Sequence, residues 1–293
     1  MKRQLKKEII DKLTKSNLWI NKIENDCRNQ KVFMAIRNDK IGFYHKGGLL
    51  FSFEDINGFK THIKYAAVIE PNGKSYLSET ELNNFNLSTD FERNYQRIQE
   101  NCSKYSGIEA SGVSEIYHKY SYFSDNDVVV LDIEVSFKSN DLLVNDELIN
   151  DELINMKTTK QDRIDILLFQ KSTKTLKFVE AKHYSNTEIV STTTPKVIKQ
   201  LKRYEDQIKQ KETGIIEQYQ NYVKILNVLF QLNLPVPGKI DPKVTLLIFG
   251  FDTDQLNGRM KKWISNNEKY KEIKVYKKGK VSSIVINNLW NQK

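Results

Sequence analysis

Cysteine is scarce in this sequence, which has Cys27 and Cys102 as its only two among 293 residues. Neither belongs to a Cys-x-x-Cys pair or has a histidine at ligand spacing. These spacings argue against both a zinc-binding motif and a disulfide framework. We expect both side chains to be ordinary buried thiols.

Long hydrophobic runs are also missing. No window approaches the roughly 18 consecutive apolar residues of a membrane span, and the first residues, MKRQLKKEIIDKL, lack the apolar centre of a signal peptide. The hydrophobic content of 39% is nevertheless enough to fill a core. We therefore expect a globular protein of the cytoplasm that has no membrane partner.

Proline and glycine are few, with 5 and 12 residues, and no Pro/Gly/Ser-rich linker divides the chain. A change of composition near residue 105 is the only sign of a boundary. We therefore expect an N-terminal region over residues 1–105 and a second domain over 106–293.

Positive charge is concentrated in the second half. From Met156 to Lys293 there are 26 Lys and Arg against 13 Asp and Glu, whereas the preceding residues have 20 against 24. Clustered positive charge attracts polyanions and favours nucleic acid as a partner. The alternative is a Lys-rich surface that is simply solvated.

The N-terminal region has the pattern of a small α+β fold. Leu5, Ile9 and Leu13 recur at helical spacing and predict a first helix that extends to about Ile20. Residues 31–37, 41–46 and 48–53 are apolar runs separated by Asn-Asp and Gly-Gly, which predict a short antiparallel meander. No chemistry can be assigned to this region from its residues.

The second domain has a more informative order of elements. Helical patterns cover residues 108–120, 195–211 and 214–232, and strand patterns cover 127–137, 163–170, 176–184 and 244–252. The expected order is α-β-β-β-α-β, with the two helical patterns after residue 195 lying before the last strand. The short segment KSTKT should join the second and third strands as a hairpin.

Three ionisable residues interrupt the apolar hairpin. Alternation along LKFVEAKHY puts Glu180 and Lys182 on one face of a strand, and the hairpin can place Asp165 beside Glu180. Two neighbouring carboxylates repel unless a cation lies between them. Mg²⁺ or Mn²⁺ would resolve this conflict, with the carbonyl of Ala181 as a further ligand. Lys182 would then position or deprotonate an attacking water.

The spacing Asp165…Glu180-Ala181-Lys182 resembles the PD-(D/E)xK nuclease superfamily. Gln200 and Tyr204, one helical turn apart on the next helix, resemble the QxxxY motif of its RecB-like branch. The resemblance covers about residues 107–255 and implies a restriction-endonuclease-like αβββαβ core with a mixed sheet. By the same resemblance, Glu115 is a candidate acid on the preceding helix and a further metal ligand.

The resemblance implies a metal-dependent nuclease that hydrolyses phosphodiester bonds in DNA, with a role in restriction, repair or anti-phage defence. The expected catalytic set is therefore Asp165, Glu180, Lys182, Gln200, Glu115 and Tyr204. Asp162 is a rival for the first acid, and no proline precedes Asp165 as it would in the family pattern.

Further cations lie on the Gln200 helix. If this helix lies beside the metal, it can contact DNA phosphates through Lys196, Lys199, Lys202 and Arg203. The N-terminal region would select the substrate, bind a partner protein or form a homodimer.

Each residue also has a simpler reading. Asp165 can pair with Arg163, Tyr204 can be a core residue, Glu115 a solvated acid, and the four cations a solvated helix face. A non-catalytic nucleic-acid-binding or assembly module that retains the nuclease fold is therefore the alternative function. DNA and RNA both remain open as substrates, as do endonuclease and exonuclease action.

Overall fold

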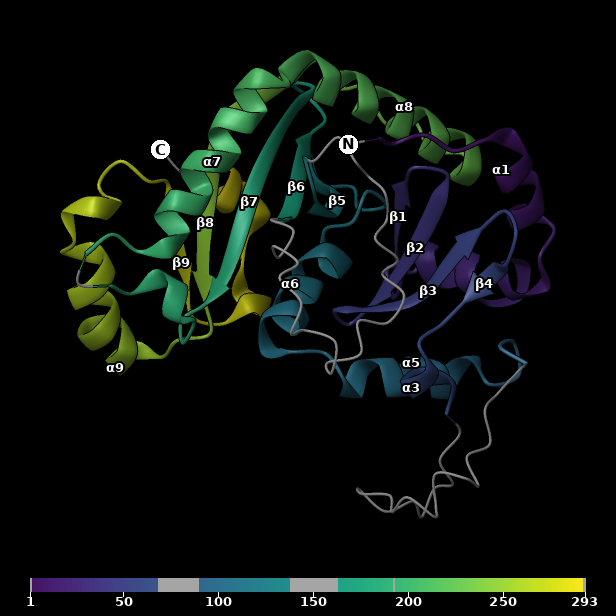
Figure 1. Ribbon diagram of the computed structural model, residues 1–293, viewed down its shortest axis with the longest axis horizontal. Coiled ribbons are helices and arrows are strands. Elements are labelled where there is room, and N and C mark those ends of the chain that lie inside the picture. Colours follow the sequence, from purple (N-terminus) through teal and green to yellow (C-terminus); the bar gives the residue numbers. More distant parts are fainter. Residues whose placement is uncertain (1, 68–89, 138–162, 192, 292–293) are drawn as a thin grey trace, which may run out of the picture. The chain divides into compact units, whose positions relative to one another are not determined.

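A computed structural model describes residues 2–67, 90–137, 163–191 and 193–291 of the chain (Figure 1). The chain divides into two compact units, Leu5–Ala110 and Ser111–Lys293, and the residues before Leu5 belong to the second unit. The first unit has a four-stranded sheet and the second a five-stranded one. The boundary expected at residues 105 and 106 lies close to this division, but the placement of the first residues was not expected.

The first unit has the meander expected from its sequence. Its strands β1 (Phe33–Arg37), β2 (Lys40–His45), β3 (Gly48–Glu54) and β4 (Gly58–Lys60) pair antiparallel in that order. The helical elements are α1 (Lys7–Thr14), a π-helical turn η1 (Trp19–Ile23), α2 (Glu24–Arg28), α3 (Ile63–Ala66) and α5 (Tyr95–Lys104). The first helix is therefore shorter than predicted.

Aromatic contacts between β3 and α5 form part of the core of the first unit. The rings of Phe51 and Tyr95 are stacked with their centroids 6.1 Å apart. The Tyr95 hydroxyl donates a hydrogen bond to buried Asp26, 3.0 Å away. These aromatic side chains pack in a core here, rather than standing on a surface where bases could stack.

The second unit contains a mixed sheet in the order β5-β6-β7-β8-β9. The strands are β5 (Val128–Val135), β6 (Ile164–Gln170), β7 (Thr175–His183), β8 (Lys239–Phe249) and β9 (Val275–Lys278). The pairs β5–β6 and β6–β7 are antiparallel, whereas β7–β8 and β8–β9 are parallel. The first four strands were predicted, and the hairpin between β6 and β7 is confirmed.

Helices lie on both faces of this sheet (Figure 1). They are α6 (Ile108–Lys119), α7 (Lys196–Gln210), α8 (Glu212–Phe230), α9 (Thr253–Gln255) and α10 (Ile286–Trp290). Phe137 contacts both Phe178 of β7 and Tyr204 of α7, so α7 covers the face of the sheet to which Phe178 points. The side chain of the neighbouring Lys177 points to the other face, where it contacts α10. None of the helices in the described parts of the chain is long and apolar enough to cross a membrane.

A glycine allows α6 to approach the sheet. A Cβ atom built on Gly112 would lie 2.3 Å from a ring carbon of Phe249 in β8, which is closer than atoms can pack. Glycine makes the helix intrinsically less stable than alanine would, but it permits this close contact.

We expect Gly112→Ala to destabilise the protein by about 1 to 3 kcal/mol, because the added methyl group overpacks the core. Gly214→Ala in α8 is the matched control, since a Cβ there meets nothing within 4 Å. The control should be neutral or stabilising by up to about 1 kcal/mol. Urea denaturation of both variants measures the difference, and equal effects would show that the contact with Phe249 is unimportant.

A buried ion pair fixes the residues before Leu5 to the second unit. The Arg3 guanidinium lies 2.8 Å from the Asp132 carboxylate of β5, and both side chains are almost fully buried. The Tyr219 hydroxyl of α8 donates a second hydrogen bond to Asp132, also at 2.8 Å. Asp132 is thus a structural acid held by elements distant in the sequence.

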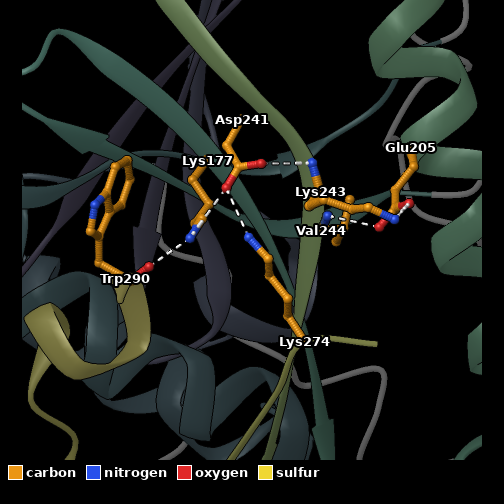
Figure 2. A network of polar contacts seen from close by, with 7 residues as sticks. All are labelled: Lys177, Glu205, Asp241, Lys243, Val244, Lys274 and Trp290. Carbon is orange, nitrogen blue, oxygen red and sulfur yellow. Dashed lines mark hydrogen bonds and ion pairs between the residues drawn. The ribbon is translucent and has the colours of Figure 1, made fainter. Parts of the chain in front are cut away.

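A second polar network links strands β7 and β8 to each other and to helices α7 and α10 (Figure 2). Lys177 donates a hydrogen bond to the Trp290 carbonyl at 2.6 Å and pairs with Asp241 at 3.3 Å. Burial lowers the pKa of Lys177, and Asp241 offsets part of this effect. Glu205 of α7 accepts hydrogen bonds from Lys243 and from the Val244 backbone. The network lies near the N-terminal end of β7.

Candidate functional site

The hairpin of β6 and β7 brings Asp165 to the Glu-x-Lys segment. The paired register ends at Ile166 and Val179, and one further step puts Asp165 opposite Glu180. Opposite residues of antiparallel strands point to the same face of the sheet. Asp165 Oδ2 also accepts a hydrogen bond from the Ala181 backbone N–H at 2.7 Å. The strand pairing therefore gathers the predicted residues at one place.

Glu180 and Lys182 form a buried ion pair on β7. Glu180 is only 1% exposed, and its Oε1 lies 3.0 Å from the Lys182 amine. Lys182 also lies 3.1 Å from Glu188 Oε2. The amine is therefore held between one buried and one partly exposed carboxylate.

Glu188 was not predicted from the sequence. It belongs to the short 3₁₀ helix η2 (Thr187–Ile189), where the Asn186 side chain accepts a hydrogen bond from its backbone N–H at 2.9 Å. The capping asparagine is visible in the sequence as the start of a turn. Only the folded loop places this acid over Lys182.

The surroundings of Lys182 fix its charge. Burial alone would lower the pKa of Lys182, but the charges of Glu180 and Asp165 and the hydrogen bonds to Glu180 and Glu188 raise it above its ordinary value. The amine is thus protonated throughout the neutral range. In this state Lys182 acts as a cation and hydrogen-bond donor.

Gln200 and Tyr204 form a hydrogen-bonded chain from α7 to β6. Gln200 Nε2 donates to the Tyr204 hydroxyl at 2.8 Å, and the hydroxyl donates to the Arg163 carbonyl, also at 2.8 Å. Tyr204 is 1% exposed and packs beside Phe137. Tyr204 is therefore both a core residue and a residue that positions the end of β6, two residues before Asp165.

We expect Tyr204→Phe to destabilise the protein by about 1 to 3 kcal/mol, because the partly buried Arg163 carbonyl and the Gln200 amide each lose a partner. Thermal unfolding compared with Tyr105→Phe, at an exposed position in the first unit, measures this effect. An unchanged melting temperature would show that the hydroxyl does not hold the strand end.

Glu115 lies on α6 and is exposed. Among the described residues, no three His, Cys, Asp or Glu side chains gather as a group able to hold a metal ion, so Glu115 is not brought together with Asp165 and Glu180. The near approach of α6 to Phe249 also puts this helix against the face of the sheet opposite Glu180. A role for Glu115 stays a prediction.

Other acids near the hairpin have partners or lie outside the described residues. Arg163 pairs with Glu134 at 3.3 Å, so this arginine has a partner other than Asp165. Asp132, which shares β5 with Glu134, is held by Arg3 and Tyr219. Asp162, the rival for the first acid, lies outside the part of the chain that the structure describes.

The predicted phosphate-binding cations lie on the solvent side of α7. The apolar side of this helix packs on the sheet through Val197, Leu201 and Ile208. Four exposed side chains face away from that core: Lys196, Lys199, Lys202 and Arg203. Their exposure fits both a DNA-binding surface and a solvated helix face.

Comparison of the chain with protein-family models, with curated proteins and with solved structures finds no match in any of the three. The function of this site is therefore inferred from its geometry and from its residues.

Proposed function

We propose that this protein is a metal-dependent nuclease that hydrolyses phosphodiester bonds in DNA. The observation that carries the proposal is the convergence of Asp165, Glu180 and Lys182 on neighbouring strands, with Asp165 bonded to the backbone between the other two. The order α6, β5, β6, β7, α7, α8, β8 supports a restriction-endonuclease-like core of the PD-(D/E)xK type. The hydrogen-bonded Gln200 and Tyr204 support the RecB-like branch.

The residues fit a hard divalent cation. Two carboxylates at opposed strand positions offer oxygen ligands of the kind that Mg²⁺ and Mn²⁺ prefer. The N–H and C=O groups of one residue in a strand point toward the same neighbouring strand. The Ala181 N–H donates to Asp165, so the Ala181 carbonyl is also directed toward β6 and Asp165. Two protein carboxylates leave room for water and substrate oxygens. When bound, the metal would polarise the scissile phosphate and activate water.

The protein's own residues would contribute positioning and charge. Protonated Lys182 offsets negative charge that develops on the phosphate and orients the attacking water through hydrogen bonds. Glu180 and Glu188 hold the amine in place, and burial strengthens these interactions. Tyr204 and Gln200 hold Arg163, and with it the start of β6 that carries Asp165, to α7.

The basic half of the chain supports DNA as the substrate. The excess of Lys and Arg after residue 155 belongs to the unit that contains the site. The cations of α7 would contact the phosphate backbone, and the first unit would select the substrate, a partner or a second copy of the chain. A place in restriction, repair or defence against phage belongs to the same proposal.

One observation favours the alternative, a non-catalytic binding or assembly module. Lys182 pairs with both Glu180 and Glu188, and a buried ion pair is a common structural feature. The two functions differ in their requirement for metal: only the nuclease needs the carboxylates to bind a divalent ion.

Incubation of the purified protein with linear, circular and single-stranded DNA and with RNA, with and without Mg²⁺ or Mn²⁺, tests the proposal. We expect metal-dependent loss of DNA that EDTA prevents. Loss of linear DNA with survival of circular DNA would identify an exonuclease. Intact substrates under all metal conditions would instead favour the non-catalytic module.

A further inference from the structure

A basic segment follows β8 and lies next to the candidate site. Residues 256–280, named here the C-terminal basic segment, contain nine Lys and Arg but only two acids. They form a π-helix η3 (Leu256–Ser265), a 3₁₀ turn η4 (Glu268–Tyr270) and the edge strand β9. Clustered positive charge repels itself and attracts polyanions.

Two hydrogen bonds fasten this part of the chain to the end of β7. The Tyr270 hydroxyl donates to the Ile189 carbonyl at 2.7 Å, directly beside Glu188. Gln255, the last residue before the segment, donates to the Tyr184 hydroxyl at 2.7 Å. The segment thus borders the loop whose Glu188 pairs with Lys182 (Figure 1).

The strand register gives a second link. Lys182 is paired with Ile248, and Ile248 is paired with Lys277 in β9. Paired residues of parallel strands share a face, so the two lysines lie on the same face of the sheet. Their Cα atoms are about 10 Å apart, the width of two strand spacings. The Lys277 amine donates a hydrogen bond to the Ser265 hydroxyl of η3 at 2.8 Å, which links β9 to the helical part of the segment.

Several cations of the segment are available to a ligand. Lys271 pairs with Glu268, and Lys274 pairs with Asp241. Lys261, Lys262 and Lys269 are exposed, and among the described residues none of these three has a carboxylate within salt-bridge distance. Lys262 lies 5.1 Å from the Trp263 ring, so a cation and an aromatic surface are adjacent.

We propose that the C-terminal basic segment is the surface that holds the phosphate backbone of DNA beside the candidate site. This proposal rests on the proposed nuclease function and extends it, because the cations first expected to bind DNA lie on α7. Lys277 and its hydrogen bond to Ser265 place η3 at the β9 edge of the sheet, two strands away from Lys182. The edge strand β9 and the π-helix thus form a part of the molecule that binds substrate.

The test uses the triple variant Lys261→Gln, Lys262→Gln and Lys269→Gln. Fluorescence anisotropy of a labelled DNA duplex in EDTA measures binding without cleavage. We expect the dissociation constant to rise at least about tenfold at physiological salt, and the slope of log affinity against log salt to fall by about 3, near 1 for each lost contact. With Mg²⁺, KM should rise while kcat stays near that of the unmodified protein.

The matched control is Lys174→Gln, Lys224→Gln and Lys239→Gln, three exposed lysines outside the segment: Lys174 directly precedes β7, Lys224 lies on α8 and Lys239 begins β8. It removes the same charge, and its affinity should stay within about twofold of the unmodified protein's if location matters more than net charge. Equal loss in both triple variants, or none in the first, overturns the proposal. The anisotropy measurement contains no metal, so it tests DNA binding separately from cleavage. If the protein binds DNA through this segment but does not cleave it with metal, the binding proposal stands and the nuclease function is refuted.

Discussion

Glu180→Gln should abolish metal-dependent cleavage of DNA, with a loss of about a thousandfold or more. This size corresponds to several kcal/mol of transition-state stabilisation, as expected when a metal ligand is removed. The substitution keeps the shape of the side chain but removes its charge. Lys182 keeps Glu188 as its partner at 3.1 Å, so the fold should survive. Single-turnover cleavage of a linear duplex measures the effect.

The matched control is Glu188→Gln, which removes the other carboxylate partner of Lys182. Glu188 is partly exposed and has no predicted part in metal binding, so its loss should cost far less activity. Circular dichroism and DNA binding in EDTA should be unchanged for both variants. Cleavage by Glu180→Gln at the rate of the unmodified protein would remove this carboxylate from the mechanism.

Arg3→Ala should destabilise the protein by about 3 to 5 kcal/mol, the largest stability effect that we predict. The substitution leaves the Asp132 carboxylate buried with no arginine to balance its charge, and breaking one side of a buried ion pair typically costs this much. The Tyr219 hydroxyl would remain as a partner but carries no charge. Urea denaturation at neutral pH measures the change in the free energy of unfolding.

The double variant Arg3→Met with Asp132→Asn is the control, because it removes both charges together. It should recover most of the lost stability, since paired removal of buried charges is often nearly neutral. A loss below about 1 kcal/mol for Arg3→Ala would place the pair in the range of exposed salt bridges. The residues before Leu5 would then not be anchored by this contact.

Local patterns were enough to predict the hairpin and its charged residues. The alternation of LKFVEAKHY fixes which side chains share a face, and the short KSTKT turn forces the antiparallel pairing of β6 and β7. Together these features place Asp165, Glu180 and Lys182 at one end of the hairpin. The Gln200 and Tyr204 pair follows from helical spacing in the same way.

Features that depend on distant contacts could not be read from the sequence. Arg3 and Asp132 are separated by 129 positions, and nothing in either local pattern indicates that they meet. Glu188 becomes part of the site only through the path of its loop. The strand β9 is short and rich in lysine, so its pairing with β8 depends on the finished sheet.

Calorimetric titration of Mn²⁺ into the protein tests the central claim most directly, because the claim is that Asp165 and Glu180 share one cation. The account predicts a binding site in the unmodified protein that is lost or greatly weakened in both Asp165→Asn and Glu180→Gln, with each variant still folded. Binding of equal strength and stoichiometry in all three proteins, or none in the unmodified protein, would contradict it.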